Sequence, residues 1–396
     1  MLCNLYINHW ISKTWNVEGF AIYNLIKRIS SFLAFPLLIG AGIGIPRYIS
    51  FLKKDVKNNS FEYLLAGSCI FISSLLLFTA LTFLFPSVFL KVFEQTQGNK
   101  NTILWCMLFF VGSQGLYVLV NAYYRGLMQF GIMSLLNVLL MSVIPLLVLF
   151  YAGNIFDYFY GVALFSLFML LGILVFIAFK SVVSIRAIQI KSIRLFKYGY
   201  PRIVAELGLF AIELMPIYLI GVYIGLKESG YLSMCFLLIK LAAMIYELAG
   251  SLVLPYFGKL YKNSSSTVFI KAVNQLLTIG FLGGIVIAFG FYLLIPFVID
   301  QFFPALITAI APAQYLFIVF PIYAVYLLLR NILDIVLEKA YNSINLSIVF
   351  VVQLIVLAIG FHFKNFMIYT VLAVAIPYLI LGILTFLVWT NRKQTI

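Results

Sequence analysis

Uninterrupted apolar stretches dominate this chain, and each is about as long as a helix must be to cross the core of a lipid bilayer, roughly 20 residues. Eleven such stretches follow one another with short connections, so neither face of a membrane leaves room for a soluble catalytic domain. The expected spans lie near residues 21–46, 61–85, 103–124, 131–151, 158–179, 202–225, 231–256, 272–298, 306–329, 343–361 and 366–389.

Composition supports the same conclusion. Of the 396 residues, 64% are hydrophobic and only 10% are charged, and the mean hydropathy is +1.11. Soluble domains are about half apolar and roughly a quarter charged. These values exclude a soluble enzyme, a nucleic-acid-binding module and a disordered chain. The strands of an outer-membrane barrel would alternate polar and apolar residues, which the continuous stretches do not. The sequence therefore predicts an all-α polytopic membrane protein.

Basic residues are distributed unevenly between the two sides of this span map. Eighteen of the 26 lysines and arginines fall on the side of the 47–60 loop, five fall on the other side, and three lie inside spans. Lysine and arginine collect in cytoplasmic loops. The asymmetry therefore predicts a cytoplasmic C-terminus and, with eleven spans, an N-terminus outside. The basic loop at 180–201 is interpreted as a linker between two halves, or as a helix lying on anionic headgroups.

Two spans resemble each other at a spacing of about 210 residues. The first carries Lys27 and ends at Pro46, and the seventh carries Lys240 and ends at Pro255, with an aromatic and basic residues close behind each proline. If this is an internal repeat, the chain has two parallel six-span halves that lack the first span. We therefore expect pseudo-symmetric lobes at residues 1–190, with about five spans, and 191–396, with six.

Several of these segments resemble a known family. The stretches 18–25 (EGFAIYNL), 42–49 (GIGIPRYI), 120–126 (VNAYYRG) and 144–146 (IPL) are similar to segments of bacterial polysaccharide flippases. The closest group is the O-antigen flippases of the multidrug/oligosaccharidyl-lipid/polysaccharide (MOP) exporter superfamily. The resemblance implies a twelve-helix exporter fold, of which the first helix is absent here. Members share little sequence, so no catalytic motif is carried over.

The resemblance also implies a function. A chain of this family would move undecaprenyl-diphosphate-linked oligosaccharide, such as an O-antigen repeat unit, from the cytoplasmic to the periplasmic leaflet by alternating access. It would lie in the bacterial inner membrane, contact membrane lipids and work with other polysaccharide assembly proteins. No nucleic-acid partner is expected.

Cationic residues inside the spans are the main candidates for binding such cargo, because a charge in hydrocarbon is costly and is kept for a reason. Arg28 and Lys240 are proposed to bind the diphosphate, since guanidinium and ammonium groups pair with phosphate oxygens. Lys27 ranks below Arg28, because adjacent helical residues point about 100° apart and do not share one small site. Arg47 and Arg125 end their spans on the inner side. They either anchor the topology or capture the diphosphate.

Three acidic residues inside the spans are candidates for coupling transport to protons or sodium. Glu213 and Glu206 are seven residues apart on one helix face, and Glu247 is seven residues from Lys240. A buried carboxylate that binds and releases a cation is suited to coupling. The alternative is a static ion pair of Lys240 with Glu213 or Glu247.

No cofactor or metal site is predicted. The two histidines, His9 and His362, are far apart and have no nearby cysteine or aspartate. The four cysteines show no paired spacing and are interpreted as small core residues.

Two other functions remain open. An O-antigen polymerase or another lipid-linked membrane glycosyltransferase would also have many spans. Such polymerases, however, are expected to have a large outer loop that carries acids or arginines. The longest outer loop here, near 86–102, carries only three charges, which counts against a polymerase. A cation-coupled drug exporter of the same superfamily is the second. Cations within the spans would repel cationic drugs, and they favour anionic cargo instead.

Overall fold

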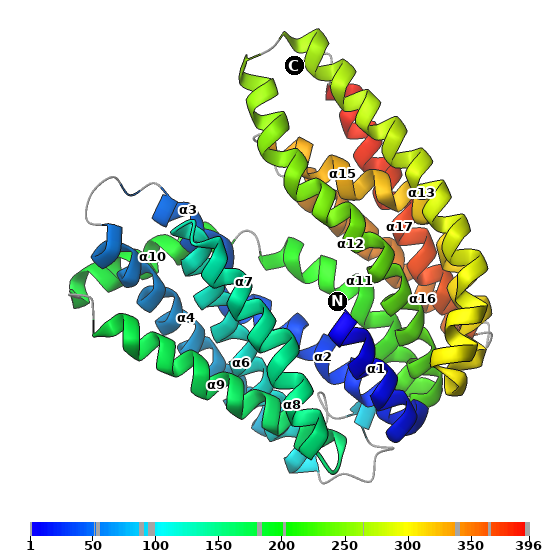
Figure 1. Ribbon diagram of the computed structural model, residues 1–396, viewed down its shortest axis with the longest axis horizontal. Coiled ribbons are helices and arrows are strands. Elements are labelled where there is room, and N and C mark those ends of the chain that lie inside the picture. The colour runs from blue at the N-terminus through cyan, green and yellow to red at the C-terminus, as the bar shows by residue number, and fades with distance from the viewer. Residues whose placement is uncertain are drawn as a thin grey trace. The chain divides into compact units, whose positions relative to one another are not determined.

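The chain is helical throughout the part that the computed structural model describes (Figure 1). The expected all-α membrane fold is therefore confirmed. The described residues are 2–50, 52, 56–86, 91–93, 100–179, 184–200, 203–263, 265–336, 341–362 and 366–392.

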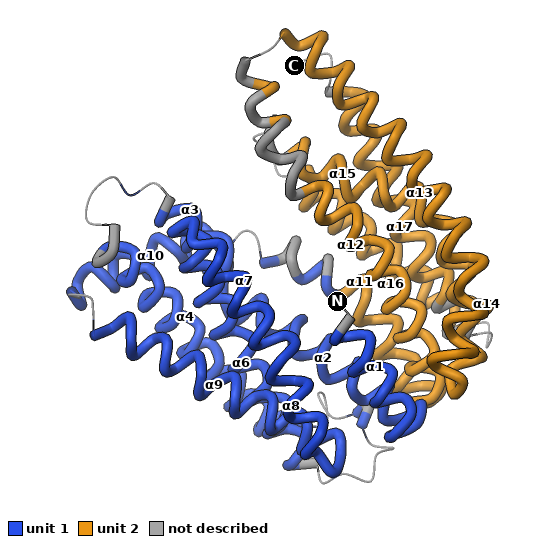
Figure 2. The backbone as a smooth tube through the Cα atoms, in the orientation of Figure 1, with its two compact units in different colours: residues 1–210 blue, residues 211–396 orange. Residues whose placement is uncertain are grey.

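Two compact units make up the chain, residues 1–210 and residues 211–396 (Figure 2). The sequence placed the division at 190/191, which falls inside the helix Ile185–Gly199. That helix packs against helices of the first unit, so it belongs there as a whole. The observed division instead lies within the following helix, Ile203–Tyr223.

Unit 1 begins with a short helix that the span map does not contain, α1, which packs against α2 and α8. A π-helical turn, η2, interrupts the fourth expected span between α7 and α8. The elements of unit 1 are α1 (Leu2–Thr14), α2 (Asn16–Leu38), α3 (Ala41–Ser50), α4 (Val56–Leu84), η1 (Lys91–Phe93), α6 (Lys100–Gly126), α7 (Phe130–Val138), η2 (Leu139–Val143), α8 (Ile144–Tyr151), α9 (Ile155–Ala178), α10 (Ile185–Gly199) and the start of α11 (Ile203–Tyr223).

Unit 2 contains the two longest helices, α12 and α13, and a single expected span that is divided into η4, α14 and α15. Its elements after α11 are α12 (Leu226–Asn263), α13 (Ser266–Phe302), η4 (Pro304–Ala309), α14 (Ile310–Ile318), α15 (Phe320–Val336), α16 (Tyr341–His362) and α17 (Phe366–Arg392).

The number of membrane-spanning helices is close to the expected eleven. Within the described residues, eight helices are long and apolar enough to cross a bilayer, and two bent helix pairs raise the number to ten. The bent pairs are α2 with α3 and η4–α14 with α15, which turn by 52° and 57°. The remaining expected span, 202–225, corresponds to α11, whose apolar stretch Phe210–Tyr223 is shorter. The chain is a multi-pass membrane protein.

The bend between α2 and α3 has a local cause. Ile39 and Gly40 both adopt positive φ angles, 47° and 68°, which end α2 in a left-handed turn. Glycine is the residue that tolerates this conformation without strain. A Cβ atom on Gly40 would also lie 2.5 Å from the Cα atom of Gly199, so the end of α10 approaches the bend closely.

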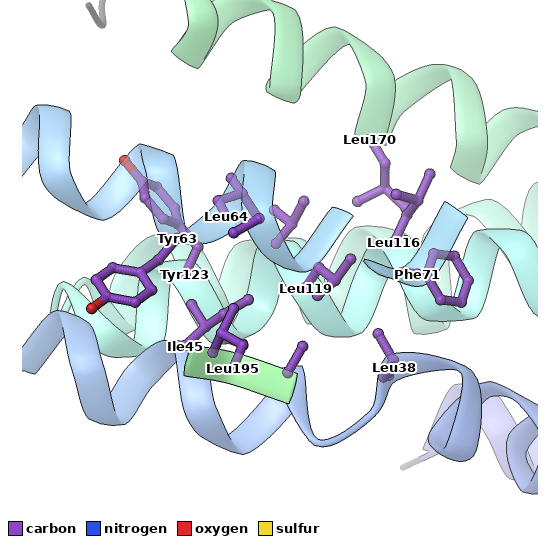
Figure 3. Close-up of a cluster of buried hydrophobic side chains, with 14 of the residues drawn as sticks. Leu38, Ile45, Tyr63, Leu64, Phe71, Leu116, Leu119, Tyr123, Leu170 and Leu195 are labelled. Atoms are coloured by element: carbon purple, nitrogen blue, oxygen red, sulfur yellow. The ribbon is translucent and has the colours of Figure 1, made fainter. Parts of the chain in front are cut away.

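The core of unit 1 lies between α3, α4 and α6 and includes one side chain from α10 (Figure 3). Ile45, Leu64 and Leu119 are fully buried there, and Leu195 of α10 is buried beside them. Lipid tails are as apolar as these side chains, so burying the side chains between helices gains little from the hydrophobic effect. Such contacts therefore stabilise the unit chiefly by close packing.

The two units share a packing pattern that agrees with the internal repeat. In unit 1, α6 packs against α2, α3, α4 and α9. In unit 2, α15 packs against α12, α13 and α17. The third span counted from α2–α3 in unit 1, and from α12 in unit 2, therefore contacts the first, second and fifth of its series, which agrees with pairing the first expected span with the seventh. The breaks differ, because the first span is bent at Ile39–Gly40 whereas α12 is continuous.

Prolines inside the helices leave backbone carbonyls without an N–H donor four residues later. In unit 2, Pro216 of α11 frees the carbonyl of Ile212, and Pro377 of α17 frees that of Ala373. The buried Gln353 of α16 donates from Nε2 to both, at 2.7 and 2.9 Å. One side-chain amide thus satisfies two proline-freed carbonyls on two different helices.

The same solution recurs on α13. Pro296 frees the carbonyl of Tyr292, and Gln314 of α14 donates to that carbonyl from Nε2 at 3.0 Å. In hydrocarbon an unsatisfied backbone group costs several kcal/mol. Neighbouring helices therefore supply the donors that allow these prolines within the spans.

Candidate functional site

A cavity of about 280 Å³, lined by apolar and polar side chains, lies in unit 1 between α1, α2, α6, α9 and the η2–α8 segment. Among its described lining residues, Lys27 alone is charged. The lining residues are Asn4, Ile7, Tyr23, Lys27, Ser31, Phe110, Gln114, Leu140, Met141, Pro145, Tyr158, Phe159 and Val162. The arrangement is a cationic chamber within the membrane-spanning part of the unit.

Helical spacing places three polar residues of α2 on the wall of this cavity. Tyr23, Lys27 and Ser31 are four residues apart in succession, so they share one helix face. Arg28 is half-buried and is not among the lining residues, because it points about 100° away. The sequence ranked Arg28 above Lys27. For this cavity the structure reverses that order.

Lys27 lies further along its helix than the span map suggested. Helix α2 begins at Asn16 rather than near residue 21, so Lys27 is eleven residues into it, or about 16 Å at 1.5 Å per residue.

The described partners of the Lys27 ammonium group are all neutral. Nζ donates to the hydroxyl of Tyr23 at 3.2 Å and to Oδ1 of Asn4 at 3.4 Å. It also lies 5.0 Å from the centre of the Tyr23 ring. These contacts solvate the positive charge without neutralising it, so the chamber keeps a net attraction for anions.

The π-helical turn η2 forms part of the chamber wall. Here the N–H of Ile144 bonds to the carbonyl of Leu139, five residues back, and Pro145 follows directly. Met141, whose carbonyl Pro145 frees, is a lining residue. Single π-turns within α-helices often occur at functional sites, where they re-aim the chain.

Arg125 of α6 donates a hydrogen bond to the backbone near the bend between α2 and α3. Its Nη2 donates to the carbonyl of Gly42 at 2.7 Å, the carbonyl that Pro46 of α3 leaves free. Arg125 also lines a cavity of about 200 Å³, together with Asn121 and Tyr117. The sequence offered topology anchoring or diphosphate capture for Arg125, and this backbone contact is a third role that it did not foresee.

A hydrogen-bonded group of polar side chains lies beside Arg125. The Tyr117 hydroxyl donates to Oδ1 of Asn137 at 2.6 Å, and Nδ2 of Asn121 donates to the same oxygen at 2.8 Å. Asn137 belongs to α7 and the other two belong to α6. The group fixes α7 against α6 near the cavity of Arg125.

Arg47 lies exposed on α3. Its Nη1 donates to the hydroxyl of Tyr198 at 3.2 Å, and its guanidinium lies 5.0 Å from the centre of that ring. Tyr198 belongs to α10. Arg47 thus helps to hold α10 against α3.

Two of the candidate charged residues of unit 2, Lys240 and Glu213, are paired with each other. Lys240 of α12 lies 2.8 Å from a carboxylate oxygen of Glu213 on α11. The Glu213 side chain is 19% exposed and that of Lys240 is 53% exposed. This is the ion pair that the sequence offered as an alternative to an unpaired coupling carboxylate.

Glu247 is near a different cation from the one considered in the sequence analysis. Its Oε1 lies 4.0 Å from Nη2 of Arg330 on α15, and the Glu247 side chain is 51% exposed. The Arg330 guanidinium also lies 5.9 Å from the ring of Tyr326. The side chain of Glu206, the third acidic candidate, lies outside the described residues.

Sequence reasoning missed a buried ion pair in unit 1. Glu62 of α4 pairs with Lys191 of α10, and their side chains are only 9% and 12% exposed. Lys191 also donates to the carbonyl of Asn59 at 3.0 Å. The sequence did contain a signal for this pair, because Glu62 stands at the start of the apolar stretch 61–85 and the basic segment 180–201 follows later in the chain.

Aromatic rings extend this contact between α10 and its neighbours. Tyr48 and Tyr63 stack at 5.4 Å, and Nη1 of Arg194 donates to the hydroxyl of Tyr63 at 3.1 Å. The basic segment 180–201 is therefore not only a linker, because its helix docks on α3 and α4.

Comparisons with known proteins identify the fold. No family model matches the sequence, and no curated protein does. An inward-facing multidrug resistance MATE family transporter of the MOP superfamily has a similar structure, with a TM-score of 0.79 and 14% identity over 100% of this chain and 94% of that one. The lipid II flippase MurJ in an inward closed conformation gives a TM-score of 0.73 and 15% identity over 98% and 85%.

A third solved structure is relevant because its binding pocket is described as reversed in polarity. It is a MOP superfamily transporter from Pyrococcus furiosus, described as having a binding pocket of reverse polarity that suggests a different function. The TM-score is 0.62, with 15% identity over 100% of this chain and 92% of that one. These likenesses show that the chain has the fold of MOP superfamily transporters.

Proposed function

We propose that this protein is a flippase that moves a lipid-diphosphate-linked oligosaccharide, such as an O-antigen repeat unit on undecaprenyl diphosphate, from the cytoplasmic to the outer leaflet of a bacterial inner membrane. The observation that carries the proposal is Lys27 in its chamber. A lysine within a helix of the membrane-spanning part, held only by neutral described partners, has a positive charge available for an anion.

Charge balance distinguishes Lys27 from the cations of unit 2. Lys240 and Arg330 each lie within 4.0 Å of a carboxylate, so their charges are compensated inside the protein. Among the lining residues of the Lys27 chamber that the structure describes there is no acidic side chain. Diphosphate supplies the missing negative charge, and its oxygens accept hydrogen bonds from ammonium, hydroxyl and amide groups alike.

The structural neighbours are compatible with this cargo. One of them, MurJ, is named a lipid II flippase, so the cargo in its name is a lipid. We infer transport by alternating access and no chemical step. Membrane lipids and other polysaccharide assembly proteins are the proposed partners.

The Lys240–Glu213 pair provides a way to couple transport to an ion. Binding of a proton or a sodium ion by the Glu213 carboxylate would release the Lys240 ammonium, which is already half-exposed. The released ammonium would then attract the diphosphate. In this scheme the coupling ion and the anionic cargo favour the same state of unit 2.

A cation-coupled drug exporter is the second candidate. The MATE neighbours support it, and so does Glu247, whose carboxylate is half-exposed and only 4.0 Å from its nearest cation. A loosely held carboxylate attracts a cationic drug.

The two candidates are separated by transport in proteoliposomes. Purified protein is reconstituted, and inward or outward movement of a fluorescent lipid-diphosphate oligosaccharide is measured beside uptake of a cationic dye. We expect lipid movement in the wild type, its loss in Lys27→Met and partial activity in Lys27→Arg. The matched control is Lys13→Met, an exposed lysine at the end of α1. Lipid movement by Lys27→Met at the wild-type rate would refute the proposed site, and dye uptake without lipid movement would favour the exporter.

A further inference from the structure

A long apolar groove runs along unit 2 between α13 and α17, and α15 forms its floor. Its volume is about 580 Å³. The side chains that line it are Asn274, Leu277, Thr278, Phe281, Leu282, Ile322, Val325, Gly382, Ile383, Phe386, Leu387 and Thr390. From Asn274 to Leu282 it follows α13 for about 12 Å at 1.5 Å per residue.

The walls of the groove are large apolar side chains that stay exposed. Phe281 and Leu282 of α13 face Phe386 and Leu387 of α17, and all four are exposed in the described structure. The floor is tight, because a Cβ atom on Gly382 would collide with the backbone of α15 at Ile322. A linear apolar chain matches this shape better than a compact molecule.

One end of the groove is polar. Asn274, Thr278 and Thr390 lie there, and Asn274 and Thr278 also line an adjoining open cavity of about 790 Å³. Lys271 and Gln275 of α13 extend that cavity away from the groove. The site as a whole is therefore apolar over its length and polar and cationic at one end.

A hydrogen bond from a buried side chain of α17 fixes the orientation of Asn274. The buried indole of Trp389 donates from Nε1 to Oδ1 of Asn274 at 3.1 Å. This bond engages the acceptor oxygen of Asn274, so the N–H groups of the amide are the donors that this lining residue can offer to a ligand. Phosphate oxygens accept from such donors and pair with the ammonium of Lys271, one helical turn away.

We infer that this groove binds the apolar tail of a lipid whose phosphate-bearing head contacts Asn274 and Lys271. Lys271 lies on the side that the charge asymmetry assigns to the cytoplasm, where anionic headgroups attract basic residues. The occupant is an anionic phospholipid of the inner leaflet, because its headgroup lies on the side of the membrane to which Lys271 is assigned. This assignment does not rest on the proposed function, and preferential binding of a polyprenyl diphosphate would contradict it.

The inference is tested by native mass spectrometry of delipidated full-length protein. The probes are undecaprenyl diphosphate and phosphatidylglycerol, each titrated alone and then against the other. We expect one tightly held lipid in the wild type. Its dissociation constant should rise roughly tenfold in Lys271→Ala, the loss of one charge-assisted contact. Asn274→Asp should weaken binding as well, because it keeps the acceptor for Trp389 but removes both donors.

The tail is tested by filling the groove. Leu387→Trp should abolish the retained lipid, and Leu293→Trp, an exposed leucine of α13 outside the groove, should not. Lys197→Ala on α10 is the matched control for Lys271→Ala. Binding that is equal in wild type, Leu387→Trp and Lys271→Ala would overturn the inference.

Competition identifies the source of the lipid. Displacement of phosphatidylglycerol by undecaprenyl diphosphate would overturn the assignment to a phospholipid, and the reverse preference supports it. The proposed function is judged separately by the proteoliposome assay. Groove variants that bind normally, beside a Lys27→Met variant that does not transport, would refute the groove and leave the flippase standing. Lysine-dependent phospholipid binding without transport of lipid-linked oligosaccharide would do the opposite.

Discussion

The side-chain amide of Gln353 donates to the backbone carbonyl of Ile212 at 2.7 Å, across from α16 to α11. That carbonyl is available because Pro216 has no N–H to donate to it. The same amide nitrogen donates to Ala373, the residue four before Pro377. Two prolines that would otherwise weaken their helices are thus tied together by one buried glutamine.

Replacing this glutamine should destabilise unit 2. Gln353→Met keeps the volume but leaves the carbonyls of Ile212 and Ala373 without a donor. Each unsatisfied group costs about 1–3 kcal/mol, so we expect a clear loss of thermal stability in detergent. Gln189→Met, an exposed glutamine on α10, is the control.

Restoring the backbone donors should rescue that variant. Pro216→Ala and Pro377→Ala reintroduce the two missing N–H groups, so the carbonyls no longer need the amide. We expect Gln353→Met to cost much less stability in the double-alanine background than in the wild type. Equal costs in both backgrounds, measured as a double-mutant cycle, would show that Gln353 acts in some other way.

Arg125 and Pro46 form a second pair of this kind, and here the cycle separates structure from transport. Arg125→Met leaves the Gly42 carbonyl without its donor, and Pro46→Ala should restore stability. We expect transport by the double variant to stay low, because it still lacks the guanidinium that lines the adjacent cavity in the wild type. Recovery of both stability and transport would make Arg125 purely structural.

The buried pair of Glu62 and Lys191 should hold α10 in place. Removing one partner, as in Glu62→Gln, leaves a buried charge uncompensated, which costs about 3–5 kcal/mol. The exchanged variant Glu62→Lys with Lys191→Glu should recover part of that loss. Stability is read from thermal unfolding, and limited proteolysis of 184–200 reports detachment of α10. Unchanged stability and proteolysis in Glu62→Gln would contradict this role.

Coupling should depend on Glu213. Glu213→Gln removes the carboxylate and leaves Lys240 unpaired, so transport in proteoliposomes should no longer respond to a proton or sodium gradient. Binding of the diphosphate lipid should become tighter, since the ammonium is released from its partner. An ion response equal to that of the wild type would exclude Glu213 as the coupling group. Glu228→Gln, at the start of α12, is the control.

Hydropathy alone determined the helical membrane fold and the approximate position of most spans, because the bilayer requires each crossing segment to be a helix of apolar residues. The pairing of the first and seventh spans also emerged from the sequence, through Lys27, Lys240 and the prolines that end both spans. These are local features, and they do not depend on which helices later become neighbours.

Tertiary structure decided which polar groups meet. The sequence shows Lys27 beside Arg28, and only the packing of α1, α6 and α9 around α2 places Lys27 in a chamber and Arg28 outside its lining. It shows prolines and glutamines, but not that Gln353 would reach the carbonyls of Ile212 and Ala373. Hydrogen bonds and ion pairs form over a few ångströms between residues on different helices, which are 20 positions apart for Gln353 and Ala373 and 141 positions apart for Gln353 and Ile212. Helix packing, and not periodicity along the chain, selects them.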